Sequence, residues 1–167
     1  MSKVKMFILF LVSIFLDMTI LPKFSIYGIA PSMAIAVIVI VSMHAKSDKI
    51  TYYGIFLGLI FDIVFGKILG LRALSFYLIS YYTFKNRKFA GATFSYGLIA
   101  VFVSVLVHEM YLHIANMVRV GAVNLGQTAN YLMRYVSLSL VINVIVYIVL
   151  YFIIDRVIKS EKRKFFY

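Results

Sequence analysis

The sequence predicts an all-α integral membrane protein, folded as one bundle of six transmembrane helices. The chain has 167 residues, of which 63% are hydrophobic and only 14% are charged. An ordinary soluble domain carries about 25% charged residues. Six spans of about 20 residues each would use about 120 residues and leave too few for a separate soluble domain. We therefore expect a single transmembrane domain over residues 1–167.

Six apolar runs supply the expected helices, and they cover residues 5–21, 27–43, 50–65, 68–84, 93–117 and 131–158. The first run follows Lys3 and Lys5, as the apolar part of a signal peptide would. No alanine precedes Ala30, so an Ala-x-Ala cleavage site is missing and we expect an uncleaved first helix. Pro31 is expected in the first turn of the second helix, where its missing N–H does no harm.

Positive charges predict the orientation of the bundle. With the N-terminus inside, twelve basic residues fall in inside segments and five in outside segments. Cytoplasmic loops carry an excess of Lys and Arg, so both termini are expected in the cytoplasm. The inside set is Lys3, Lys5, Lys46, Lys49, Lys85, Arg87, Lys88, Arg156, Lys159, Lys162, Arg163 and Lys164, and the outside set is Lys23, Lys67, Arg72, Arg119 and Arg134.

The net charge of +11 does not indicate nucleic-acid binding, because the basic residues lie between long apolar runs. Residues 159–167 mix fixed charges with three aromatic side chains, which favours contact with anionic lipid on the inner leaflet. The alternative is that this tail is only a topology signal. The chain has no cysteine, and it has no Gly-x-Ser-x-Gly, Walker or Rossmann pattern. We expect no enzymatic activity and no cofactor.

Ionisable side chains inside a membrane span are expensive and need a reason. Most of those in the apolar runs lie toward the expected outer face, and five of them form a possible outer polar cluster: Asp17, His108, Glu109, His113 and Arg134. This cluster is interpreted as hydrogen-bonded groups at the outer interface or as the lining of a small pocket. No metal is expected, because His108 and His113 are five residues apart, one more than the His-Glu-x-x-His spacing.

Glycine recurs every four positions at Gly54, Gly58, Gly66 and Gly70, and Asp62 occupies the position between. Glycines four apart give a helix a flat groove that another helix can approach closely. Two interpretations stay open, an internal helix in the groove or the helix of a partner protein.

The third and fourth runs, separated only by Gly66 and Lys67, are expected to form a tight hairpin. Arg72 would then lie near Asp62 and interact with it. We expect Asp62→Asn to be milder than Arg72→Ala, because the second change strands a charge.

The string YGIFLGLIFDIVFGKILGLRAL, residues 53–74, resembles the MreD family of bacterial rod shape-determining membrane proteins. That family's pattern reads roughly G-x-x-x-G-x-x-x-D-x-x-x-G-x-x-L-G-x-R-A-L, and the chain matches each fixed position. Pro31 before an apolar helix and the basic C-terminal tail agree as well.

The resemblance implies a non-enzymatic scaffold of the cell-elongation machinery in the bacterial inner membrane. Its partners would be MreC, a single-span protein, together with the MreB filament, a RodA-type glycosyltransferase and a penicillin-binding transpeptidase. MreD proteins are also similar in fold to the substrate-binding subunits of energy-coupling-factor vitamin transporters. A small-molecule-binding subunit of such a transporter is therefore the alternative, although the first run lacks the alanines of that family's docking patch.

Overall fold

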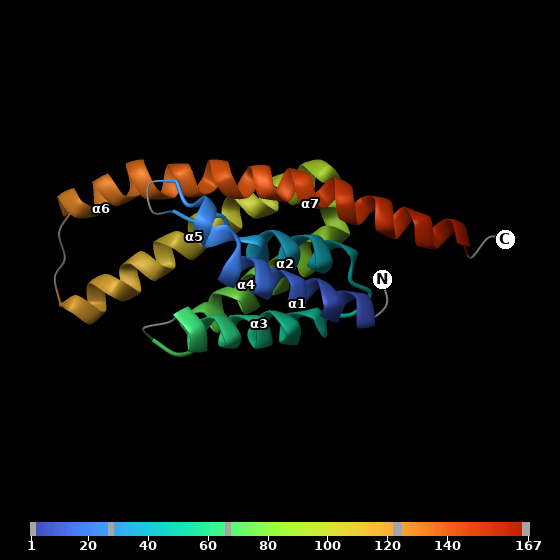
Figure 1. Cartoon of the computed structure of the whole chain (residues 1–167), viewed down its shortest axis with the longest axis horizontal. Coiled ribbons are helices and arrows are strands. Elements are labelled where there is room, and N and C mark those ends of the chain that lie inside the picture. The colour runs from blue at the N-terminus through green and yellow to red at the C-terminus, as the bar shows by residue number, and fades with distance from the viewer. Residues whose placement is uncertain (1–2, 27–28, 66–67, 122–124, 165–167) are drawn as a thin grey trace.

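The computed structural model describes residues 3–26, 29–65, 68–121 and 125–164, and these residues form helices and no strand. Six long helical segments follow one another along the chain (Figure 1). They are α1 (Lys3–Thr19), α2 (Met33–His44), α3 (Ile50–Phe65), α4 (Leu71–Ala90), α5 (Phe94–Val120) and a last segment of three parts, namely α6 (Leu125–Tyr131), the π-helical turn η2 (Leu132–Val136) and α7 (Ser137–Lys164). A short 3₁₀ helix, η1 (Leu21–Phe24), follows α1.

The long helices lie roughly along one axis of the molecule (Figure 1). α1 begins and α7 ends at the same end of the bundle, whereas α5 and α6 diverge toward the opposite end. α3 and α4 form the most extensive helix pair. α2 lies in the centre and contacts α1, α3, α4, α5 and α7.

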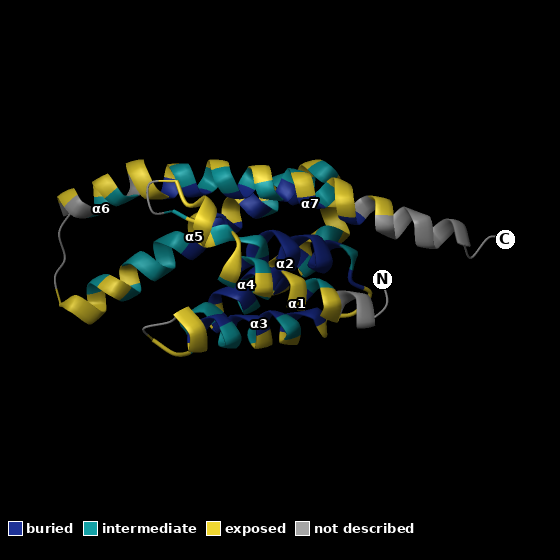
Figure 2. Ribbon diagram, in the orientation of Figure 1, coloured by how far each residue is buried: buried dark blue, intermediate teal, exposed yellow. Residues whose placement is uncertain are grey.

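α2 is the buried core of the bundle. All of its residues from 34 to 43 are buried, and Figure 2 shows the helix enclosed by its neighbours. A helix that is apolar on every side lies either in a protein core or in lipid. In α2 the neighbouring helices provide this cover, and its run of alanine, valine and isoleucine is compatible with that central place.

The start of α2 corrects the expected range of 27–43. Residues 27 and 28 lie outside the described part of the chain, and α2 itself begins only at Met33. The Asp17 carboxylate accepts hydrogen bonds from the backbone N–H of Met33 at 2.6 Å and of Ala34 at 3.0 Å. Pro31 therefore precedes the helix instead of lying in its first turn, because the first turn that Asp17 caps begins at Met33.

The end of α4 corrects a second expected range, 68–84. α4 begins at Leu71 and continues to Ala90, so it includes Lys85, Arg87 and Lys88, which were expected in the inside segment after the helix. Arg87 in this extra turn donates hydrogen bonds to the carbonyls of Met43 and Ala45 at the end of α2. A cation at a helix C-terminus is favourable, because the last carbonyls carry partial negative charge.

Smaller differences affect the other ranges. α1 ends at Thr19 and gives way to η1, which contains Pro22. α5 runs three residues beyond the expected 117, to Val120. The last segment begins at Leu125 instead of 131, because α6 continues into α7 through the π-helical turn. α3 covers the expected range of 50–65.

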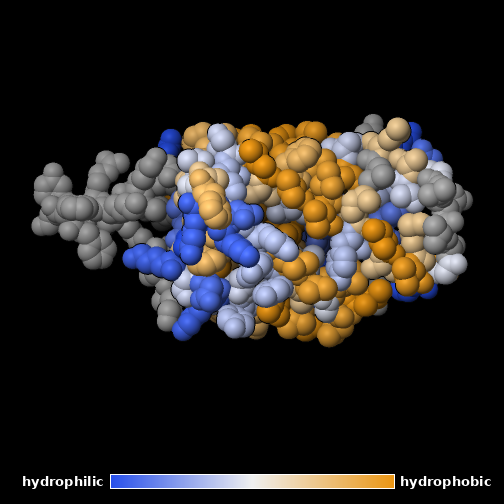
Figure 3. All heavy atoms as spheres, turned by 180° about the vertical axis from the view of Figure 1, so that it is seen from behind, coloured by the Kyte–Doolittle hydropathy of each residue, from blue (hydrophilic) through white to orange (hydrophobic). Residues whose placement is uncertain are grey.

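Two helices are long and apolar enough to cross a membrane by length and composition, α5 and the stretch Thr128–Ile154. Shorter apolar helices accompany them over Phe7–Thr19, Met33–His44 and Ile50–Phe65. Figure 3 shows one face of the molecule, on which hydrophobic side chains cover the middle and hydrophilic ones gather at one end.

The groove along Gly54 and Gly58 is filled by α4. A Cβ atom added at Gly58 would lie 2.4 Å from Cα of Ala73, and one added at Gly54 would lie 2.8 Å from the carbonyl oxygen of Phe76. No side chain fits there without separating the two backbones. The structure therefore agrees with the first interpretation of the glycine row, in which an internal helix, here α4, lies in the groove.

Gly58→Leu is therefore expected to prevent correct folding. The leucine side chain would have to occupy the space of the α4 backbone, so α3 and α4 should separate and the protein should be degraded. Accumulation in membranes, followed by immunoblotting, measures this. Ile63→Leu on the same helix is the control, because Ile63 is 71% exposed and should tolerate the change. Normal accumulation of Gly58→Leu would contradict the close packing.

Candidate functional site

Asp62 holds the start of α4. Its carboxylate accepts hydrogen bonds from the backbone N–H groups of Gly70 at 2.9 Å, Arg72 at 3.0 Å and Ala73 at 3.1 Å. Asp62 is only 3% exposed, so these amides replace the water that a buried carboxylate would otherwise lack. The negative charge also lies at the positive end of the α4 dipole.

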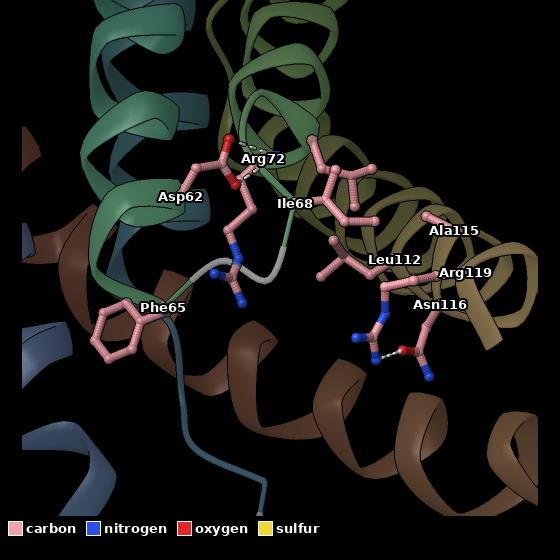
Figure 4. A pocket seen from close by; sticks show the side chains of 9 residues that line it. Asp62, Phe65, Ile68, Arg72, Leu112, Ala115, Asn116 and Arg119 are labelled. Carbon is pink, nitrogen blue, oxygen red and sulfur yellow. Dashed lines mark hydrogen bonds between the residues drawn. The ribbon is translucent and has the colours of Figure 1, made fainter.

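Arg72 lies beside Asp62, but its guanidinium bonds elsewhere. Nη1 of Arg72 donates to the carbonyl of Phe61 at 3.2 Å, and only the backbone amide of Arg72 reaches the carboxylate. Figure 4 shows the Asp62 side chain pointing at the first turn of α4, while the Arg72 side chain turns away from these bonds. The two residues are therefore joined by a helix cap, and the guanidinium also attracts the carboxylate electrostatically without a direct hydrogen bond to it.

The remaining glycines of the row have different surroundings. Gly70 is the residue before α4 and has a φ of 93°, which favours glycine. Gly66 lies outside the described residues.

Two members of the expected outer cluster, Asp17 and Glu109, belong to one chain of hydrogen bonds. Besides capping α2, Asp17 accepts from the Ser32 hydroxyl at 3.3 Å, and the Ser32 N–H donates to Oδ1 of Asn143 at 2.9 Å. Asn143 donates to the Ser139 carbonyl at 2.8 Å, and the Ser139 hydroxyl donates to Glu109 at 2.9 Å. The chain thus joins α1, α2, α7 and α5.

Tyr131 extends this chain to the third member of the cluster. Its hydroxyl donates to the second carboxylate oxygen of Glu109 at 2.9 Å, and its ring stacks on His113 with the centroids 4.1 Å apart. Arg134 is exposed on the π-helical turn and forms no part of the hydrogen-bonded chain described here.

His108 lies apart from the other members. It is 7% exposed, and its Nδ1 lies 2.8 Å from the Ser75 hydroxyl on α4. His108 and His113 therefore face different neighbours. Within the described ranges, no group of three His, Cys, Asp or Glu side chains could hold a metal ion.

Sequence reasoning missed the neutral members of these networks, Ser32, Ser75, Ser139 and Asn143. It considered ionisable residues alone, whereas an uncharged amide or hydroxyl in an apolar run also needs a partner. The i, i+4 spacing of Ser139 and Asn143 would have been the available signal.

The described surface has two principal hollows. The smaller, of about 180 Å³, is the hollow of Figure 4 and is lined by Asp62, Arg72, Leu112 and Arg119 among others. The larger, of about 400 Å³, runs between α4 and α5 and reaches His108 and Ser75. We call the larger one the α4–α5 groove.

Comparison with known proteins gives a match over nearly the whole chain. The family model described as rod shape-determining protein MreD matches residues 2–160. The chain belongs to the MreD family. The matched range covers the residues of both aspartate caps, of the hydrogen-bonded chain and of the α4–α5 groove. No curated protein and no solved structure matches the chain, so the comparisons add no support for a transporter subunit.

In this MreD protein, Asp62→Asn should be more damaging than Arg72→Ala, the reverse of the order expected from sequence. All three amides bond to Oδ2, and the asparagine oxygen can replace that atom, but it is a neutral acceptor, and its NH₂ group would lie close to the N–H of Arg72. A hydrogen bond to a charged group is worth about 1.5–3 kcal/mol and one between neutral groups about 0.5–1.5 kcal/mol, so each of the three bonds is weakened. Arg72→Ala removes a single hydrogen bond from a charged donor, worth about 1.5–3 kcal/mol. Thermal unfolding in detergent measures both effects, and a lower midpoint for Arg72→Ala would refute the capping role.

Proposed function

We propose that this protein is a non-enzymatic scaffold of the bacterial cell-elongation machinery and binds an MreC-like single-span protein. The observation that carries the proposal is the match to the shape-determining family over residues 2–160. The proposal extends to the MreB filament, a RodA-type glycosyltransferase and a penicillin-binding transpeptidase as members of the same assembly.

The geometry supports a scaffold because the charged groups have structural partners. Asp17 and Asp62 cap helices, and Glu109 accepts from two hydroxyl groups. A general acid or base must instead be able to reach a substrate. The glycine row is also occupied by α4, so a partner must bind another surface of the bundle.

We further propose that the chain spans the inner membrane six times with both termini in the cytoplasm. The distribution of basic residues supports this orientation, and so does the common end at which α1 begins and α7 ends (Figure 1). The anionic inner leaflet would then attract residues 159–167, whose side chains lie outside the described part of the chain.

Single cysteines test this topology cleanly, because the native chain has none. Lys85→Cys should resist an impermeant thiol reagent in intact cells and react after the cells are opened. Val120→Cys, at the far end of α5, should react in intact cells. Both positions are exposed, so a difference in labelling reports the side of the membrane. Labelling of Lys85→Cys from outside would overturn the orientation.

The scaffold function is tested by purifying the tagged protein from its native membrane in mild detergent, followed by mass spectrometry. An MreC-like single-span protein should be recovered with it, and expression of the chain should restore rod shape to cells that lack it. A tagged multi-span transporter from the same membrane is the control for non-specific recovery. Recovery of an ATPase pair with its coupling protein, and no MreC-like protein, would contradict the proposal.

A further inference from the structure

The α4–α5 groove is elongated and follows the helices that form it. Along α5 its lining extends from Tyr96 to Tyr111, a rise of about 22 Å at 1.5 Å per residue. The hydrocarbon core of a bilayer is about 30 Å thick. The groove therefore has the length and direction to receive several turns of a helix lying beside α4 and α5.

Small and polar side chains line part of the groove. Ala100 and Ser104 are four residues apart on α5, and Ser75 and Thr83 belong to α4. Small residues let a second helix approach closely, which is the main source of helix association in membranes. Taller side chains, such as that of Val103, complete the lining.

His108 gives the groove an unused hydrogen-bonding atom. The Ser75 hydroxyl donates to the carbonyl of Arg72 at 3.0 Å and also contacts Nδ1 of His108 at 2.8 Å. A hydroxyl has one proton, so a neutral imidazole makes both bonds only when its Nδ1 carries a proton and donates. Nε2 is then an acceptor, and none of the hydrogen bonds found among the described residues involves it. It is not among the fully buried side-chain atoms that lack a partner, so it remains within reach from the groove.

This acceptor distinguishes between possible occupants of the groove. A lipid acyl chain would fill the apolar part but offers no donor, and a buried acceptor without a donor is unfavourable. A helix can present a serine, threonine, asparagine or glutamine side chain at the right depth. His108 is 93% shielded from solvent by the protein itself, since it is 7% exposed, so its partner must enter through the groove.

We propose that the α4–α5 groove binds the transmembrane helix of the single-span partner, and that this helix donates a hydrogen bond to Nε2 of His108. The inference rests on the proposed function and adds the surface and the chemistry of contact. α4 and α5 are the two walls, the small residues permit close approach, and His108 fixes the depth of the partner's polar side chain.

Filling the groove tests the surface. Val103→Trp adds bulk inside the groove, and Val149→Trp on α7 is the matched control. The two valines are 51% and 53% exposed, and only Val103 lines the groove. Co-purification of the tagged MreC-like protein should fall at least tenfold for Val103→Trp and stay unchanged for Val149→Trp, with equal accumulation of both.

Cysteines at the same two positions identify the occupant. In membranes treated with a permeant thiol oxidant such as diamide, Val103→Cys should form a disulfide with a cysteine placed in the partner's span, and Val149→Cys should not. A disulfide only between two copies of this chain, or none with any position of the partner's span, would overturn the assignment.

Two substitutions test the hydrogen bond. His108→Phe keeps an aromatic ring but removes the acceptor, and His108→Gln places an amide oxygen near the position of Nε2. Both variants lose the bond to Ser75, so this loss cannot explain a difference in association between them. Association should weaken about three- to tenfold in His108→Phe and recover in His108→Gln. Equal association of the two variants would refute the role of Nε2.

The outcomes separate the two levels of the proposal. If the wild-type protein recovers no MreC-like partner, the proposed function and this inference both fail. If it recovers the partner and Val103→Trp does so equally well, the groove assignment fails while the scaffold function stands.

Discussion

The architecture depends on how the ends of α2 are satisfied. This helix has 12 residues and is about 18 Å long, shorter than a hydrocarbon core of about 30 Å. Its free N–H and C=O groups lie inside the protein, where no water completes their hydrogen bonds. Asp17 and Asn143 meet the first turn, and Arg87 meets the last carbonyls. The positions of α1, α4 and α7 are therefore constrained, because each must place one of these side chains at an end of α2.

The same solution appears twice, since Asp17 at the end of α1 caps α2 and Asp62 near the end of α3 caps α4. Each carboxylate stands at the positive end of the next helix, and the backbone N–H groups there offset much of the cost of burying a charge. Acidic residues in an apolar chain can indicate a catalytic or binding site, but Asp17 and Asp62 instead stabilise the starts of two helices. The α4–α5 groove differs from them, because there a polar atom of His108 lacks a partner among the described residues.

Local pattern predicted the number of helical segments and the flat face of α3, because hydrophobic runs and glycines four apart report on a helix and its immediate packing. The true ends of α2 and α4 depend on bonds between residues 16 and 44 apart, which no local pattern contains. The outer cluster was predicted only in part for a related reason. His108 and Glu109 are neighbours in sequence, but they point to different helices, and their partners Ser75 and Ser139 are uncharged.

The bond from Ser32 to Asn143 has a consequence for biosynthesis. The two residues are 111 positions apart, so a ribosome adding about 5–20 residues per second makes the acceptor about 6–22 s after the donor. During that interval the start of α2 has Asp17 but lacks Asn143. Until the last helix is made, the Ser32 N–H must bond to water, to a lipid headgroup or to the insertion machinery. The hydrogen bond that joins the start of α2 to α7 therefore forms late, and it needs both halves of the chain.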